Sequence, residues 1–294
     1  MKNTVKIFLL MLGLTALFLF LGQSLGGRQG LITAFILAMG MNFFTYWFSD
    51  KIVLAMYRAR PLPKEDAPEI YDLVEELTQK ANLPMPKIYL LSIDTPNAFA
   101  TGRNPAHASI AVTKGILNIL EREELKGVLA HEMAHIKNRD ILVAMVAATI
   151  AGAIMFLARM AQYAMIFAGE RDDRERGGNP LGLLLLAVLA PLAALIIQLA
   201  ISRTREYQAD ETGAKVSYAP LGLARALEKL DAYARRQPIF GANPSTAHLF
   251  IVNPLRGGSF MTLFSTHPPI TERIKRLEKI AQQLAGYEIP KIIY

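Results

Sequence analysis

Four long stretches without a charged residue alternate with polar stretches along the chain. These uncharged stretches run over 7–27, 29–49, 141–158 and 177–202. A helix needs about 20 mostly apolar residues to cross a hydrocarbon core of about 30 Å. The pattern therefore predicts about four transmembrane helices, of which the first two are joined by a turn at 26–30.

Two of the four stretches leave an alternative open. Lys2 and Lys6 precede the first stretch, as basic residues precede the apolar core of a cleaved signal peptide. That stretch is longer than an ordinary signal core, and no clear cleavage site follows it. Arg159 interrupts the third stretch, which could instead be a buried helix of a soluble domain.

The polar stretches have the periodicity of a small folded domain. Apolar residues at helical spacing predict helices, and short β-rich runs predict strands. The predicted helices are 67–81, 114–120, 121–138, 220–236 and 268–284, the predicted strands are 87–92, 97–101 and 109–113, and 237–264 is predicted to be a long loop. The fold class expected is a mainly α, polytopic membrane protein with an α+β domain that holds a small sheet.

These patterns divide the chain into four parts. Residues 1–50 form a first pair of transmembrane helices and 141–202 a second pair, while 51–140 and 203–294 are the two halves of the α+β domain. Basic residues near the ends of predicted spans mark the cytoplasmic side of a membrane. Most of them lie on the side of the two domain halves: Lys2, Lys6, Lys51, Arg58, Arg60, Lys64, Lys137, Arg139, Arg203 and Arg205. The domain is therefore expected in the cytoplasm, although Arg171, Arg174 and Arg176 in the opposite loop count against this orientation.

Composition narrows the class of protein further. The chain is 52% hydrophobic and only 19% charged, whereas a soluble domain carries about 25% charged residues. A disordered protein is excluded and a wholly soluble one is disfavoured. The chain has no cysteine, which excludes a thiol nucleophile and a metal site with cysteine ligands. The net charge is +7, but basic and aromatic residues are not interleaved as in a nucleic-acid site, so nucleic acid is not expected as a partner.

The candidate chemistry lies at residues 131–135, which have the pattern H-E-x-x-H within a predicted helix. His131 and His135 are four residues apart, so both imidazoles can reach one metal ion from the same helix face. Glu132 can act on a water molecule bound to that ion. The alternative is that these are two histidines and a glutamate with structural roles only.

A catalytic zinc ion usually has three protein ligands. The best candidate for the third is Glu206, and Asp210, one turn later, can hold the outer nitrogen of a ligand histidine. The alternative is an exposed pair of acids. His107 and His248 lie in loop-like sequence, and Asp140 is expected to cap or orient the end of its helix. The helical pair 141–202 would return the chain to the side that it left, which brings Glu206 back to His135.

These motifs, in this order around the apolar stretches, resemble the HtpX-type integral-membrane zinc metalloproteases, relatives of the CAAX prenyl proteases. The resemblance covers nearly the whole chain and rests on segments 97–102, 131–135, 138–140, 206–210 and 267–273. It implies a zincin-like catalytic domain with one zinc ion (Zn2+) per chain. His131, His135 and Glu206 would be the metal ligands, and Glu132 would be the catalytic base.

Further roles are expected for residues of the same motifs. Asp210 would hold a ligand histidine from behind, and Arg273 would pair with Asp210. His267 would stabilise the oxyanion of the reaction. The strand 97–101 would offer its edge to an extended peptide, with Asn97, Ala98, Phe99 and Ala100 as substrate-binding residues. Asn97 could instead be a turn residue, His267 a structural residue beside the prolines, and Arg273 a solvated helix charge.

The resemblance implies an endopeptidase of a bacterial-type cytoplasmic (inner) membrane that acts in membrane-protein quality control, with its active site in the cytoplasm. Its expected partners are polypeptide substrates, membrane proteins among them, and the lipid bilayer. A prenyl-protein processing protease is the alternative with the same chemistry. A zinc-binding membrane scaffold without activity is the alternative from a different class. The sequence predicts neither the oligomeric state nor the cleavage preference.

Overall fold

The computed structural model describes residues 2–143, 146–147, 203–236, 249–252 and 268–287. Two compact units account for the chain: Met1–Ser49 with Val143–Ile201, and Asp50–Leu142 with Ser202–Tyr294. Nearly all of the third and fourth predicted spans, most of the predicted loop and His267 lie outside the described residues.

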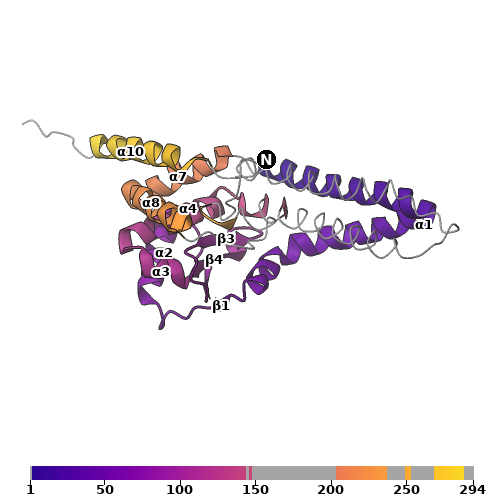
Figure 1. Cartoon of the computed structure of the whole chain (residues 1–294), viewed down its shortest axis with the longest axis horizontal. Coiled ribbons are helices and arrows are strands. Elements are labelled where there is room, and N and C mark those ends of the chain that lie inside the picture. The colour runs from indigo at the N-terminus through magenta and orange to yellow at the C-terminus, as the bar shows by residue number, and fades with distance from the viewer. Residues whose placement is uncertain (1, 144–145, 148–202, 237–248, 253–267, 288–294) are drawn as a thin grey trace, which may run out of the picture. The chain divides into compact units, whose positions relative to one another are not determined.

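Most of the long helix α1 (Lys2–Met56) belongs to the first unit, and this helix is broken at two glycines. Gly27 has φ 54° and ψ −141°, a conformation that glycine adopts without a steric penalty because it has no Cβ. The break lies within the turn predicted at 26–30, and Figure 1 shows α1 folded back on itself there. The two arms, Val5–Ser24 and Gly26–Phe48, are each long and apolar enough to cross a bilayer.

The two arms of α1 pack through small and polar side chains. A Cβ built on Gly22 would lie 2.5 Å from the carbonyl oxygen of Gly30, so the two backbones are in direct contact. The Nδ2 of Asn42 donates a hydrogen bond of 3.0 Å to the Oγ1 of Thr15 on the other arm. Small residues and interhelical hydrogen bonds are the usual contacts between helices in lipid. Large apolar side chains are exposed on both arms, as a lipid environment allows: Phe8, Leu9, Leu12, Phe20, Ile32, Phe35, Ile36 and Leu37.

The second unit is an α+β domain whose elements match the predicted ones to within a few residues at their ends. Its helices are α2 (Pro68–Ala81), α3 (Lys114–Ile119), α4 (Arg122–Lys137), α7 (Arg203–Ser217), α8 (Pro220–Arg236) and α10 (Ile270–Tyr287). Its strands are β1 (Arg60–Pro61), β2 (Lys87–Leu91), β3 (Ala98–Gly102) and β4 (Ala108–Thr113). Helix α7, the short strand β1 and the 3-10 helix η1 (Pro105–His107) were not among the predicted elements.

The sheet is mixed and has the strand order β1-β2-β4-β3. Strand β2 pairs parallel with β4, in the register Lys87↔Ser109, and β3 pairs antiparallel with β4, in the register Ala98↔Val112. Strand β3 is thus an edge strand. Helix α4 packs against β3 and against α7 and α8, so this helix lies at the centre of the domain.

The core around α4 combines apolar packing with one buried anchor. Val128, Leu129 and Met133 of α4 are at most 1% exposed and belong to a core that also includes α2 and β4. Glu124 is buried near the start of α4, where its Oε2 accepts hydrogen bonds from the Glu121 N–H (2.9 Å) and the Lys229 Nζ of α8 (2.8 Å). These contacts fix where α4 begins, and α4 carries the H-E-x-x-H motif in its second half.

Candidate metal centre

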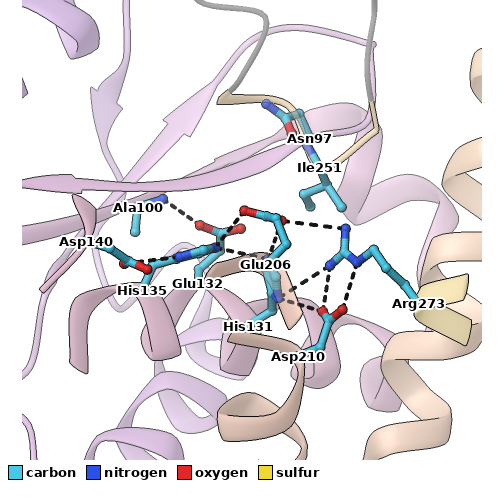
Figure 2. Close-up of polar contacts among 10 residues, drawn as sticks. All are labelled: Asn97, Ala100, His131, Glu132, His135, Asp140, Glu206, Asp210, Ile251 and Arg273. Carbon is cyan, nitrogen blue, oxygen red and sulfur yellow. Dashed lines mark hydrogen bonds and ion pairs between the residues drawn. The ribbon is translucent and has the colours of Figure 1, made fainter. Parts of the chain in front are cut away.

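Three potential metal ligands converge between α4 and α7 (Figure 2). His131 and His135 lie one turn apart on α4, and their Nε2 atoms are 3.1 Å apart. Glu206 reaches them from α7, with its Oε2 3.6 Å from the Nε2 of His131 and its Oε1 3.6 Å from the Nε2 of His135. One ligand atom from each residue lies within 4.8 Å of the others, so the three side chains can hold one metal ion.

The outer nitrogen of each imidazole faces a carboxylate. The Nδ1 of His131 is 3.0 Å from the Oδ1 of Asp210, and the Nδ1 of His135 is 3.2 Å from the Oδ1 of Asp140. A neutral imidazole whose Nδ1–H donates to a carboxylate has its lone pair on Nε2, which is the atom that faces Glu206 here. The donor set and its outer partners therefore fit a metal of the zinc type, for which two imidazoles and a carboxylate are ordinary ligands.

The carboxylate behind His131 is held by a buried arginine. Arg273 of α10, which is 0% exposed, donates from Nε to the Oδ2 of Asp210 (2.8 Å) and from Nη2 to its Oδ1 (2.6 Å). Burial opposes the ionisation of Asp210, but the Arg273 charge and the His131 hydrogen bond outweigh it and lower the pKa of Asp210 to about 2. The expected pairing of Arg273 with Asp210 is present, and it places a fixed negative charge behind His131.

The carboxylate behind His135 comes from the same chain segment. Arg139 has φ 56°, which turns the chain after α4 so that the backbone N–H of Asp140 donates to the carbonyl oxygen of His135 (3.2 Å). The Asp140 side chain then reaches the His135 ring. The sequence predicted that Asp140 caps or orients the helix end, and it did not predict this contact. The spacing of five residues after His135 was the available signal.

A second buried arginine, Arg205, lies near this side of the site. It is 7% exposed, and its Nε and Nη2 have no hydrogen-bond partner among the described residues. Burial lowers the pKa of its guanidinium, while the charges of Asp140 and Glu206 raise it. The burial of Arg205 was not predicted, and Arg203 on the same helix is exposed.

The acids around the two imidazoles create a field that favours a positive charge. Burial by itself lowers the pKa of His135, but Asp140, Glu206 and Glu132 together raise it to about 10. Burial also opposes protonation of His131, whose pKa is nevertheless raised by Asp210 and Glu206. Protons and metal ions compete for the same imidazole nitrogens. The field that raises these pKa values therefore also favours a cation bound between the rings.

Glu132 is buried beside the ligands and is bound to the edge strand. Its Oε2 accepts a hydrogen bond of 2.8 Å from the backbone N–H of Ala100 in β3. Burial raises the pKa of Glu132, although the two imidazoles and the Ala100 N–H oppose this shift. The glutamate of the H-E-x-x-H motif is thus fixed between the metal ligands and β3.

The residues predicted to bind substrate lie on β3 or directly before it, but two of them have partners within the chain. The Ala100 N–H is bound by Glu132. The side-chain amide of Asn97 donates to the carbonyl oxygen of Leu249 (3.1 Å) and accepts from the N–H of Ile251 (3.1 Å). In this structure the Asn97 side chain therefore holds backbone of its own chain, in place of the substrate backbone that was expected. The Phe99 ring packs against Tyr57, with centroids 5.8 Å apart.

A glycine lets α7 approach α4 at the metal ligands. A Cβ built on Gly213 would lie 2.9 Å from the backbone nitrogen of His131 and 3.0 Å from the carbonyl oxygen of Ala130. In folded proteins a Cβ atom is essentially never found closer than about 3.0 Å to a backbone atom of another helix. The backbones of the two ligand-bearing helices are therefore in direct contact, and this contact sets how far Glu206 lies from the two histidines.

Comparison with known proteins identifies the family. The model of peptidase family M48 matches residues 64–281, which is more than half of the chain and includes all the ligands described above. The chain belongs to peptidase family M48. Two relatives are the protease HtpX homologues of Syntrophobacter fumaroxidans, 58% identical over 95% of this chain and 100% of that protein, and of Persephonella marina, 57% identical over 97% and 99%.

This M48 chain is also similar to the solved structure of S. mikatae Ste24p. The TM-score is 0.54 at 20% identity, over 94% of this chain and 66% of that one. At this identity the likeness shows a shared fold and no more. Family membership and the identity to HtpX homologues over nearly the whole chain establish a membrane metalloprotease, and the two apolar arms of α1 agree with this class.

Proposed function

We propose that this metalloprotease is a zinc endopeptidase that hydrolyses polypeptides, in particular misfolded or damaged membrane proteins, at the cytoplasmic face of an inner membrane. The observation that carries the proposal is the convergence of His131, His135 and Glu206 beside the buried Glu132. The distribution of basic residues along the sequence supports the cytoplasmic orientation. The four uncharged stretches support a catalytic domain in two halves, 51–140 and 203–294, set between membrane pairs at 1–50 and 141–202.

In this proposal each residue of the site has one role. His131, His135 and Glu206 would hold a zinc ion, which would supply a Lewis acid for the scissile carbonyl and the attacking water. Asp210 and Asp140 keep the Nδ1 of each imidazole protonated and so direct each Nε2 inward. Arg273 keeps Asp210 ionised.

Glu132 is proposed as the group that moves the proton. Its Oε2 is fixed by the Ala100 N–H, which leaves its other oxygen to accept a proton from the attacking water. Burial raises the pKa of Glu132, and a base with a raised pKa keeps the proton long enough to pass it to the leaving amine. The edge position of β3 supports pairing of an extended peptide along Ala98, Phe99 and Ala100, through the outward backbone groups of Ala98 and Ala100. His267, proposed to stabilise the oxyanion, rests on the sequence motif.

The test compares two glutamate variants of the detergent-purified protein. Glu132→Gln removes the base, and Glu123→Gln makes the same chemical change at an exposed position of α4. We expect Glu132→Gln to retain one zinc ion per chain and to cleave casein about 10²- to 10⁴-fold more slowly, the range for general-base catalysis. Glu123→Gln should match wild type. Equal cleavage by Glu132→Gln would refute the role of Glu132, and activity that survives complete removal of metal would refute the mechanism.

A further inference from the structure

The side chain of Asn97 forms two hydrogen bonds with the backbone of residues 249–251. Its amide donates to the carbonyl oxygen of Leu249 and accepts from the N–H of Ile251, two backbone groups that lie two residues apart in a bend of the chain. The backbone of Asn97 is itself bound to β4, because its N–H donates to the Thr113 Oγ1 (2.9 Å) and its carbonyl oxygen accepts from the Thr113 N–H (3.0 Å). Asn97, which is 3% exposed, therefore ties residues 249–251 to the sheet.

The segment 249–251 is anchored by side chains as well. Leu249 and Ile251 are 7% and 5% exposed, and Ile251 belongs to the same apolar core as Ala98 and Ala100. Between them, the Phe250 ring packs against Tyr57, with centroids 6.4 Å apart, and Tyr57 in turn packs against Phe99. Ile251 lies in the apolar core with Ala98 and Ala100. Phe250 instead packs on Tyr57, as Phe99 does, and the side chain of Phe99 points to the other face of β3. Figure 2 shows Asn97 and Ile251 together beside the metal ligands.

The outer edge of β3 pairs with no other strand among the described residues, and it runs from Asn97, which contacts this segment, to Ala100, which contacts the catalytic base. The bond from the Thr113 N–H to the Asn97 carbonyl directs the backbone groups of Asn97 and Phe99 toward β4, so those of Ala98 and Ala100 point outward. The outward N–H of Ala100 is the one bound by Glu132. Asn97 lies three residues before Ala100, or about 10 Å along a strand.

We infer that residues 249–251 form a fixed end wall of the substrate cleft, and that Asn97 is the positioning residue that holds this wall on β3. The inference rests on the proposed endopeptidase function. A peptide that pairs with the outer edge of β3, which pairs with no other strand among the described residues, can extend about three residues from the reaction centre toward Asn97 before it meets the wall. A longer chain has to bend away from the sheet there, so residues beyond that point add nothing to recognition.

The experiment measures how peptide length affects kcat/KM. A series of fluorogenic peptides keeps one scissile bond and grows by one residue at a time on either side. On one side, each residue that pairs with β3 should raise kcat/KM by about 2- to 10-fold, the value of one net hydrogen bond, and the gain should stop at about the third residue. Asn97→Ala removes both bonds to the wall, so the gain should continue beyond the third residue. Asn118→Ala changes an exposed asparagine of α3 and should keep the wild-type profile.

A cross-link keeps the inference testable if Asn97→Ala fails to fold. The chain has no cysteine, so a Tyr57→Cys and Phe250→Cys pair can be joined by a short reversible reagent. A fixed wall predicts that the joined protein keeps its activity and its length profile. Loss of activity that returns when the link is reversed would mean that the segment must move aside, which overturns the wall.

The remaining outcomes separate the inference from the proposed function. Zinc-dependent cleavage by wild type, with the same length profile in a folded Asn97→Ala protein, overturns the wall alone. Absence of zinc-dependent cleavage by wild type overturns the proposed function, and the wall with it.

Discussion

His131 and His135 lie one turn apart on α4, yet the chain supports their outer nitrogens in different ways. Behind His131, Asp210 comes from α7 and is held by Arg273 of α10 through hydrogen bonds of 2.6 and 2.8 Å. Behind His135, Asp140 comes from five residues along the same segment. The His131 side chain is 3% exposed and that of His135 is 17% exposed.

This difference shows which histidine depends on the tertiary fold for its supporting carboxylate. The support of His131 requires three helices to be packed, because Arg273 is 142 residues from His131 in the sequence. The support of His135 requires only that the chain turns at Arg139. We therefore expect the His131 side to be coupled to the stability of the domain, and the His135 side to affect mainly the bound metal.

The largest effect is expected from Arg273→Leu. This change leaves the buried Asp210 charge without its guanidinium, and the loss of one partner of a buried ion pair costs about 3–5 kcal/mol. The thermal unfolding of metal-free protein in detergent measures it. Arg276→Leu is the control on the same helix, because Arg276 is exposed, and its pair with Glu272 and its contact with the Tyr207 ring are together worth about 1–2 kcal/mol. Similar losses for the two variants would show that Asp210 does not depend on Arg273.

Acid should weaken the His131 side over a defined pH window. The pKa of Asp210 is about 2 in the folded domain, whereas the ordinary pKa of an aspartate is 3.8, so ionised Asp210 stabilises the fold above about pH 4. This stabilisation, roughly 2–3 kcal/mol at 1.36 kcal/mol per pKa unit, is lost as the pH falls from 4 through 2. The melting temperature of metal-free protein, measured from pH 5 to pH 2, should fall in this window. The same curve for Asp210→Asn should lack this component.

The two supporting aspartates can be compared directly by metal affinity. Asp210→Asn and Asp140→Asn each remove the charge behind one ligand histidine, and the loss of such a partner lowers metal affinity by about 10- to 100-fold. Competition with a chelator measures both values. We expect only Asp210→Asn also to lower the melting temperature of the metal-free protein. Equal loss of stability in the two variants would contradict the difference between the two sides.

The smallest effect is expected from Arg205→Met. The Nε and Nη2 of this buried arginine have no partner among the described residues, so its burial is already unfavourable. Methionine fills much of the same volume without that penalty, and the change in unfolding free energy should stay below about 1 kcal/mol. A cost as large as that of Arg273→Leu would mean that Arg205 supports Asp140 as Arg273 supports Asp210.

The parts of the site that follow helical spacing could be predicted from the sequence. The positions of His131 and His135 on one helix face depend only on a spacing of four, and so does the relation of Glu206 to Asp210. Edge strand β3 was also predicted to within one residue, because its short β-rich run stands out between polar turns. Local patterns therefore gave the ligands and most of the elements that carry them.

The contacts that the sequence did not predict depend on the fold or on an unusual backbone angle. Asp140 meets His135 because Arg139 adopts a positive φ, which its residue type does not signal. The Asn97 amide meets Leu249, a residue 152 positions away, so no local pattern could distinguish this role from binding of a substrate. Strand β1 has only two residues, too few to form a periodic pattern.

The close contact of α7 with α4 at Gly213 sets the distances between the metal ligands. At Gly213 the two backbones touch, so even the single methyl group of alanine would act as a wedge between the helices. Such a wedge would leave every ligand in the sequence while moving Glu206 away from its histidines. A designer who transplants this site into another scaffold must therefore copy the bare backbone face at Gly213 along with the three ligands.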